Sequence, residues 1–165
     1  MSDYKTVNEQ VEKSPGVMLN QAADMVDLLG GRFFGKLDLL QGYWQMPLAA
    51  EAREIFTITT PVGLFTPTCV PEGVLNATVY FQGVMTELLV GIKCKIWMDD
   101  VLFYADTKNE RLDTIDEILG RLESVGLFAA AHKCTYSSRE IVWCGKVYSQ
   151  GQCRKIPYAC KVCLI

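Results

Sequence analysis

The feature that most constrains this chain is a pair of adjacent aspartates between two short apolar runs. Residues 95–104 read KIWMDDVLFY, so Asp99 and Asp100 stand between segments rich in β-branched and aromatic residues. This pattern predicts two strands joined by a tight turn, with the acids at or beside the turn. A solvated turn is the simplest explanation, because Asp is a common turn residue. The alternative is a bound cation, since neighbouring carboxylates repel each other without one.

A third aspartate, Asp38, stands near the end of a buried-strand pattern over residues 32–40. A cap or turn residue is again the simpler interpretation. If the strand paired antiparallel with the 95–104 hairpin, however, Asp38 would lie beside Asp99 and Asp100. Three oxygen donors with no His or Cys nearby suit Mg²⁺, with Mn²⁺ as a related ion. The sequence therefore offers a magnesium site of the kind used in phosphoryl transfer, where two ions clamp an in-line displacement.

Length and composition favour one globular domain. The chain has 165 residues, of which 50% are hydrophobic, and a net charge of −3. That charge gives no support for nucleic-acid binding, so any such role requires local basic groups or parts of a larger protein. No apolar stretch reaches about 18 residues, and the polar N-terminus has no signal-peptide pattern, so we expect no membrane association.

The cysteines predict an intracellular protein. There are seven, without regular spacing, which is typical of reduced thiols. Cys160 and Cys163 have a Cys-x-x-Cys spacing, but no second pair completes a zinc site.

Hydrophobic periodicity and turn residues predict the order of elements. The expected helices are a short one capped by Asn20 with Ala22, Met25, Val26 and Leu29 as its apolar face, one capped by Asn76 and running from Ala77 to Gly91, and one with a capping box at Thr107 that ends at Gly126. The expected β segments are hairpins over 54–70 and 95–104, a short strand over 132–136, and a bent strand or hairpin over 141–148. Residues 42–47 read as a turn or short helical segment, and residues 149–165 show no period. This order predicts an α+β domain, with helices packed on one face of a mostly antiparallel sheet.

Several motifs, in this order, resemble the reverse transcriptases of Ty3/gypsy-type LTR retrotransposons. Leu37-Asp38-Leu39 with Gly42-Tyr43 and Gln45 resembles motif A, Pro71, Gly73, Asn76-Ala77 and Phe81-Gln82 resemble motif B, and Met98-Asp99-Asp100 resembles motif C. Asp3-Tyr4-Lys5 with Asn8 is similar to the end of the fingers, Lys133-Cys134 to a pair that follows the palm helix, and Trp143-Cys144-Gly145 to the primer-grip hairpin. The resemblance covers about residues 3–157, nearly the whole chain.

The resemblance implies a palm domain of an RNA-directed DNA polymerase, acting on a primer–template and a deoxynucleotide. It implies that Asp38, Asp99 and Asp100 are catalytic and bind metal, with the carbonyl of Leu39 completing a metal shell. It assigns Tyr43, Gly73 and Gln82 to nucleotide binding, with Tyr43 as the gate against a ribose 2′-hydroxyl. It assigns Trp143, Cys144 and Gly145 to primer binding.

The same resemblance implies three segments and a cellular setting. Residues 1–31 would be a fingers remnant with a lead-in helix, residues 32–150 the palm with its primer-grip hairpin, and residues 151–165 a truncated tail. Further fingers, thumb and RNase H domains of a polyprotein are expected as partners. The expected setting is a cytoplasmic retroelement particle or the nucleus.

Two departures leave activity open. Glu72 stands where the family usually has Phe or Gln, and a carboxylate beside a triphosphate is unfavourable. Thr78-Val79 replaces the usual Pro-Ala. Besides the polymerase hypothesis, a non-catalytic remnant that keeps the fold therefore stays open. So does an unrelated metal-dependent enzyme or binding module whose acids coincide with the motifs.

Overall fold

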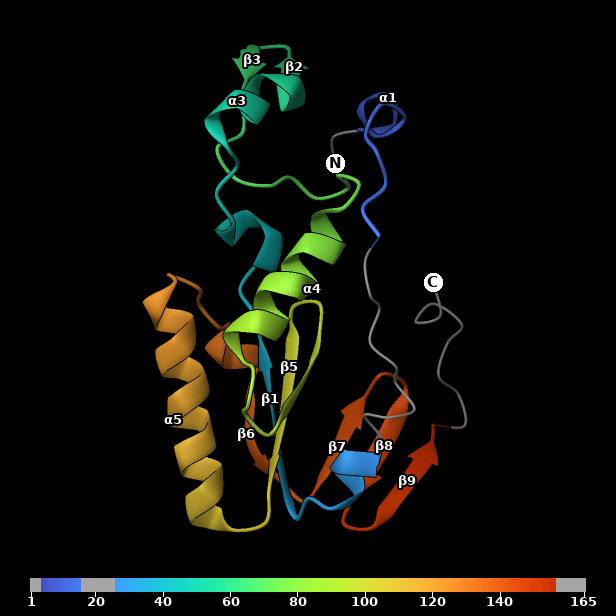
Figure 1. Ribbon diagram of the computed structural model, residues 1–165, viewed down its shortest axis with the longest axis vertical. Coiled ribbons are helices and arrows are strands. Elements are labelled where there is room, and N and C mark those ends of the chain that lie inside the picture. The colour runs from blue at the N-terminus through green and yellow to red at the C-terminus, as the bar shows by residue number, and fades with distance from the viewer. Residues whose placement is uncertain (1–3, 16–25, 157–165) are drawn as a thin grey trace.

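The computed structural model describes residues 4–15 and 26–156, and its centre is a four-stranded antiparallel sheet (Figure 1). The strand order is β4-β5-β1-β6, with bounds β1 Phe33–Asp38, β4 Cys94–Trp97, β5 Asp100–Ala105 and β6 Thr135–Ser138. Two smaller sheets accompany it. One is the hairpin of β2 (Ile58–Thr60) and β3 (Gly63–Phe65), and the other contains β7 (Glu140–Trp143), β8 (Lys146–Ser149) and β9 (Gln152–Lys155).

The helices are short except for two. These are α4 (Ala77–Leu88) and α5 (Lys108–Ser124), which lie beside the central sheet (Figure 1). The short helices are α1 (Lys5–Asn8), α3 (Ala50–Arg53) and the 3-10 turns η1 (Gly42–Gln45), η2 (Glu54–Phe56) and η3 (Ala131–Lys133). In Figure 1, α3 and the β2–β3 hairpin extend the molecule upward, away from the sheet of β7, β8 and β9.

The two faces of the central sheet bury different partners. On one face, strand residues such as Leu37, Val101 and Phe103 pack with the inward residues of α4 and α5. On the other face, Phe34 and Leu102 pack with Ile141, Trp143 and Tyr148 of the C-terminal sheet. Alternation along the strands produces this division, because neighbouring strand residues point to opposite faces. The prediction of an α+β domain with its helices on one face is confirmed.

One glycine leaves room for an aromatic ring on the helix-covered face of the sheet. Gly35 pairs with Phe103 in the β1–β5 register, and the Phe103 ring lies over it. A Cβ atom at Gly35 would be 2.0 Å from Cζ of Phe103. The strand pattern therefore contains a residue without a side chain at the position where an aromatic ring needs the space.

The capping box before α5 is confirmed, whereas the cap expected before α4 is wrong. The Thr107 hydroxyl accepts a hydrogen bond from the Glu110 amide at 3.1 Å. Asn76 has a left-handed backbone (φ 71°) and makes no side-chain cap. Its side chain binds the N-terminal segment instead, as described below.

Smaller differences concern the ends of elements. The hairpin expected over 54–70 begins with the 3-10 turn η2 before the three-residue β2. Its second run pairs with β2 only through Phe65, and Cys69 forms an isolated bridge to Pro47 instead. Part of the expected strand over 132–136 is η3, and the tail without a period contains β9. The boundary expected at residue 151 falls inside the β8–β9 turn. Asn20, Ala22 and Met25 lie outside the described residues. In the helical stretch 26–29, Leu28 is buried and Val26 is 70% exposed.

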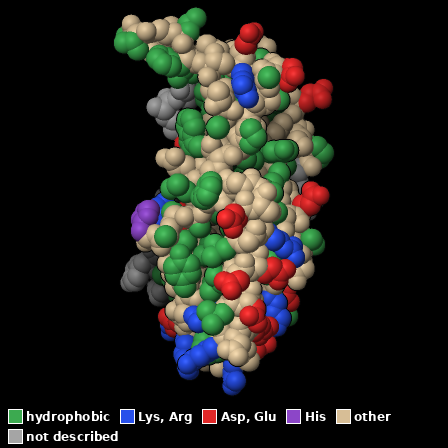
Figure 2. Space-filling view, turned by 90° about the vertical axis from the view of Figure 1, so that its left-hand side faces the viewer, with side chains coloured by type: hydrophobic (Ala, Val, Ile, Leu, Met, Phe, Trp, Pro, Cys, Tyr) green, Lys and Arg blue, Asp and Glu red, His purple; other side chains and the backbone are tan. Residues whose placement is uncertain are grey.

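Charge is distributed unevenly over the surface. In Figure 2, acidic side chains gather along one side, and Lys and Arg side chains gather at the lower end, where β1 begins in Figure 1. Within the described residues, no helix combines the length and apolar character needed to span a bilayer.

Candidate active site

The three motif aspartates meet where β1 and β5 pair. Asp38 is the last residue of β1 and lies opposite Asp100, the first residue of β5. Asp99 belongs to the two-residue turn before it, because Trp97 and Asp100 close the β4–β5 hairpin. The amide of Leu39 donates a 2.8 Å hydrogen bond to the carbonyl of Asp99. Antiparallel pairing thus brings the three acids together, as the sequence predicts.

A buried amide from α4 holds the turn that carries Asp99. Met98 has a left-handed backbone (φ 55°), which is unusual for a residue with a side chain. Its N–H donates a 2.8 Å hydrogen bond to the side-chain oxygen of Gln82. The Gln82 nitrogen lies 3.3 Å from the carbonyl of Ile96 on the preceding strand. Gln82, expected to contact the nucleotide, has both ends of its amide engaged by the hairpin, which points to a positioning role.

Two lysines approach the acids from neighbouring elements. Lys36 Nζ, two residues before Asp38 on the same face of β1, is 2.9 Å from Oδ1 and 3.0 Å from Oδ2 of Asp100. Burial raises the pKa of the Asp100 carboxyl, while the hydrogen bond and charge of Lys36 lower it, and the charges of Asp99 and Asp38 raise it. The carboxylate of Asp100 is therefore already ion-paired with Lys36.

Asp38 has a different environment. Lys133 Nζ lies 3.3 Å from Oδ1 of Asp38, and this lysine is 57% exposed. The same oxygen is buried and has no partner in hydrogen-bond geometry among the described residues. We therefore treat the Lys133 contact as an electrostatic attraction that leaves a lone pair of Oδ1 unused. A buried acceptor without a donor is costly, so this oxygen is suited to a further ligand.

The donor set fits a hard cation, although the side chains as placed do not converge on one point. Among residues 4–15 and 26–156, no group of three acidic, His or Cys side chains is close enough to hold an ion. The available oxygens are those of Asp38, Asp99 and the Leu39 backbone. The bridge between Leu39 and Ala129 uses the carbonyls of Asp38 and Phe128, and not that of Leu39. Carboxylate and carbonyl oxygens are ligands that Mg²⁺ accepts.

Tyr43 belongs to η1, and its side chain contacts α4. Its ring contacts the Phe81 ring edge-on at 5.5 Å between centroids, and its hydroxyl is 3.2 Å from Oγ1 of Thr78. The preceding Gly42 is packed so closely that a Cβ atom there would lie 3.0 Å from Phe81 and 3.3 Å from Cβ of Asp99. The motif A turn therefore fits directly against both α4 and the acidic turn.

Gly73 lies in the loop before α4, which two asparagines bind to the N-terminal segment. Asn8 donates to the carbonyl of Gly73 at 2.8 Å and accepts from the amide of Leu75 at 2.8 Å. Asn76 donates to the carbonyl of Glu12 at 2.8 Å and accepts from the Ser14 amide at 2.9 Å. Gly73 itself has φ 88°, and the neighbouring Glu72 is exposed.

This loop and Tyr43 line one cavity of about 530 Å³. Asn8 and Lys13 also line it, so the N-terminal segment contributes to the cavity. Tyr43 and Gly73, both expected to bind nucleotide, are thus brought together. Asp38, Asp99 and Asp100 are not among the lining residues.

The hairpin expected to bind primer has the predicted form. Cys144 (φ 43°) and Gly145 (φ 72°) form the two-residue turn between β7 and β8. The side chain of Trp143 is buried in the cluster behind the central sheet, against which Trp97 and Cys144 also pack. Trp143 therefore anchors the hairpin, and the turn residues Cys144 and Gly145 are only partly buried.

Sequence reasoning missed the amide side chains that join distant segments. Besides Asn8 and Asn76, Gln45 accepts a hydrogen bond of 2.6 Å from the Phe128 amide and donates to the carbonyls of Phe128 and Leu40. Except for Leu40, these partners are far away in the chain, so periodicity gives no signal for them. The resemblance marks Asn8, Gln45 and Asn76 as motif residues without giving their contacts.

Comparison with known proteins gives one family. Residues 1–148 match the family model described as "Reverse transcriptase (RNA-dependent DNA polymerase)". The chain is 28% identical over 149 residues to the "Retrovirus-related Pol polyprotein from transposon 412" of Drosophila melanogaster, a match that covers 87% of this chain and 12% of that protein. It is 24% identical over 158 residues to the corresponding polyprotein from transposon gypsy, covering 94% of this chain and 15% of that one.

Solved structures share the fold. A foamy viral protease-reverse transcriptase in complex with double-stranded DNA matches with a TM-score of 0.87 and 22% identity, covering 94% of this chain and 28% of that one. The same kind of protein in complex with an RNA/DNA hybrid matches with a TM-score of 0.82 and 21% identity, covering 94% and 21%. The chain therefore spans a small part of each protein it resembles.

Proposed function

Because the chain belongs to the reverse transcriptase family, we propose that it is the palm of an RNA-directed DNA polymerase whose catalytic acids are Asp38, Asp99 and Asp100. One observation carries the assignment of the acids. Asp38 and Asp100 are opposite each other in the β1–β5 register, and Asp99 occupies the adjoining turn. The reaction would be transfer of a nucleotide to a primer end. The relatives are retroelement polyproteins, which supports an intracellular setting, either a cytoplasmic retroelement particle or the nucleus.

The residues around the acids would have different roles in catalysis. Asp38 and Asp99, with the Leu39 carbonyl, would hold Mg²⁺ or Mn²⁺, and the buried Oδ1 of Asp38 supports this. Such ions, when bound, activate the attacking hydroxyl and stabilise the leaving pyrophosphate. Lys36 would keep Asp100 ionised against its burial and hold its position. Gln82 would fix the turn that aims Asp99.

The remaining expected roles follow the cavity and the hairpin. Tyr43 and Gly73, which line one cavity, would contact the incoming deoxynucleotide. The turn at Cys144 and Gly145, anchored by Trp143, would support the primer end. The foamy viral relatives bind RNA/DNA hybrid and double-stranded DNA, which supports primer–template as the partner. The small share of each polyprotein that the chain covers supports further domains as partners.

A second candidate is a palm that keeps the fold without polymerising. Two observations favour it. Asp100 is held by Lys36, and the acid side chains do not converge on one point among the described residues. The negative charge of Glu72, next to Gly73, would also disfavour a triphosphate.

Primer extension distinguishes the two candidates. The purified chain is incubated with poly(rA)/oligo(dT) and thymidine triphosphate, first with Mg²⁺ and then with Mn²⁺. The test variant is Asp99→Asn, and the matched control is Asp116→Asn, which changes an exposed acid on α5. The polymerase proposal expects extension that Asp99→Asn abolishes and Asp116→Asn leaves intact.

Two results would count against it. Extension retained by a folded Asp99→Asn variant would remove this acid from catalysis. A folded wild-type chain that neither extends the primer nor binds primer–template in a salt-dependent way would favour the second candidate.

A further inference from the structure

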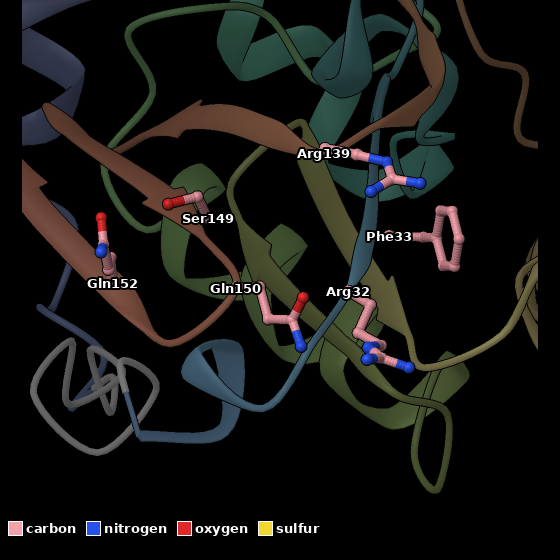
Figure 3. A pocket seen from close by; sticks show the side chains of 6 residues that line it. All are labelled: Arg32, Phe33, Arg139, Ser149, Gln150 and Gln152. Atoms are coloured by element: carbon pink, nitrogen blue, oxygen red, sulfur yellow. The ribbon is translucent and has the colours of Figure 1, made fainter.

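A second cavity, of about 480 Å³, lies at the far end of the central sheet from the acids (Figure 3). Its lining residues are Arg32, Phe33, Arg139, Ser149, Gln150 and Gln152. Phe33 begins β1 and Asp38 ends it, which at about 3.3 Å per residue separates the cavity from the acids by roughly 17 Å. The cavity is therefore distinct from the candidate active site.

Three backbone segments fix the shape of this cavity. Arg32 donates its amide to the carbonyl of Ala105 at 3.0 Å, which ties the start of β1 to the end of β5. Gly151, in the turn between β8 and β9, has φ 69° and donates its amide to the carbonyl of Leu29 at 3.0 Å. Arg139 is the single residue between β6 and β7, at a bend of the chain. The lining is therefore supported by backbone hydrogen bonds rather than by side chains alone.

The cavity has a concentrated positive charge. No acidic residue lines it, and among the described residues neither guanidinium forms an ion pair. Glu140, next to Arg139 in sequence, is paired with Arg154 at 2.7 Å. The Arg139 guanidinium lies 5.8 Å from the centre of the Phe33 ring, and in Figure 3 that ring lies between the two guanidinium groups. The contact with Phe33 orients Arg139 without neutralising it.

We propose that Arg32 and Arg139, with Ser149, Gln150 and Gln152, form a phosphate-binding site separate from the polymerase centre. Guanidinium groups bind phosphate through paired N–H donors, and the two here are oriented by a fixed backbone and an aromatic ring. A phosphate monoester carries about two negative charges near neutral pH. It therefore balances the charge of two arginines, whereas a carboxylate balances the charge of only one.

The polar residues of the β8–β9 turn extend the site beyond one phosphate group. In Figure 3, Ser149, Gln150 and Gln152 follow the β8–β9 hairpin, and of the three Gln150 is drawn nearest to the arginines. Their hydroxyl and amide groups can both donate and accept hydrogen bonds, which suits the sugar or base of a nucleotide. The ligand class is therefore a phosphate ester, either a free nucleotide or a strand of nucleic acid. The site does not rest on the proposed catalysis, because none of its residues is assigned to it.

Calorimetric titration with inorganic pyrophosphate tests the site directly. The buffer contains EDTA, so that no ion bound at the acids contributes to pyrophosphate binding. We expect saturable binding to the wild-type chain and about tenfold or greater weakening in the double variant Arg32→Gln/Arg139→Gln. Lys155→Gln is the matched control, because it removes one exposed positive charge on β9 outside the cavity.

The outcomes separate a built site from general charge attraction. Unchanged binding in the folded double variant, equal weakening by Lys155→Gln, or no saturation in the wild type would each overturn the proposal. The double variant Arg32→Lys/Arg139→Lys keeps the charges and removes the planar forks, so it replaces the Gln variant if that one does not fold. If the site binds phosphate as proposed, pyrophosphate binding should be weaker in the Lys variant as well.

Two further titrations identify the source of the phosphate. One uses adenosine monophosphate, and the other uses a single-stranded 20-nucleotide DNA at several salt concentrations. For a nucleic-acid strand, the Gln double variant should lower the salt slope of DNA binding by about 1.4, because each phosphate contact on a single strand contributes about 0.7. For a free nucleotide, it should weaken binding of the monophosphate and leave DNA binding unchanged. If the Gln double variant changed neither monophosphate binding nor the salt slope of DNA binding, the result would contradict the proposed site.

Discussion

The side-chain oxygen of Gln82 accepts a 2.8 Å hydrogen bond from the backbone amide of Met98, the residue before Asp99. Gln82 is 7% exposed and belongs to α4, whereas Met98 belongs to the turn of the β4–β5 hairpin. The geometry of the acidic turn is therefore controlled by a helix that is not part of the hairpin. A buried amide on an apolar helix face is unusual, and here it has both of its partners.

Replacing Gln82 should loosen this turn. In Gln82→Leu, the Met98 amide loses its acceptor while partly buried, which should lower the free energy of unfolding by about 1–3 kcal/mol. The rise in melting temperature on adding Mg²⁺ should also shrink, because Asp99 is no longer fixed. Urea unfolding and thermal melting with and without Mg²⁺ measure both effects. Gln10→Leu, which changes an exposed glutamine, is the control. Equal effects of the two substitutions would contradict the positioning role.

The pKa of Asp100 should depend on Lys36. Burial holds this pKa above its ordinary value of 3.8, and Lys36 acts in the opposite direction. Lys36→Met should therefore raise the pKa of Asp100 further. A raised carboxyl pKa favours the protonated folded state, so the stability it contributes is present at low pH and is lost as pH rises from 3.8 through the raised value. The variant should extend this pH window upward.

Carboxylate NMR titration measures the Asp100 pKa directly. Lys133→Met is the matched control, because Lys133 lies beside Asp38 rather than Asp100. It should leave the pKa of Asp100 close to the wild-type value. A pKa of Asp100 that is unchanged or lower in Lys36→Met would show that the ion pair does not act as described.

Gly35 should tolerate no side chain. Gly35→Ala would place Cβ at 2.0 Å from the fully buried Phe103 ring, and such overpacking should destabilise the fold by about 1–3 kcal/mol or more. Gly120→Ala is the control within α5, where no atom lies within 4 Å of the added Cβ. Because Ala favours a helix over Gly, that variant should gain about 0.5–1 kcal/mol. Urea unfolding compares the two, and equal signs would refute the packing argument.

Tyr43 should select against ribonucleotides through its ring. Tyr43→Val removes the ring that packs on Phe81 and should relax discrimination against a ribonucleoside triphosphate. Tyr43→Phe keeps the ring and loses only the 3.2 Å hydrogen bond to Thr78, so it should retain discrimination. Primer extension with matched ribo- and deoxyribonucleotides gives the ratio of kcat/KM. Unchanged selectivity in Tyr43→Val would remove this residue from the nucleotide site.

The success of sequence reasoning differs between kinds of contact. Short apolar runs around Asp38 and Asp99 predict the strands, and helical spacing predicts α4 and α5, because these patterns express local geometry. Asn76 is expected to cap α4, but its side chain binds Glu12 and Ser14 instead. The same local pattern permits both, and only the presence of a distant partner decides between them.

The sequence by itself determined which chemical groups this protein has and the order in which strands and helices present them. Three aspartates at strand ends, with no His or Cys beside them, indicate hard-cation chemistry before any fold is known. The tertiary structure decided which groups remain available. It paired Asp100 with Lys36, left an oxygen of Asp38 without a hydrogen bond, and placed Arg32 and Arg139 around one cavity. Periodicity follows from backbone geometry within one element, whereas charge pairing depends on distances between elements that only packing fixes.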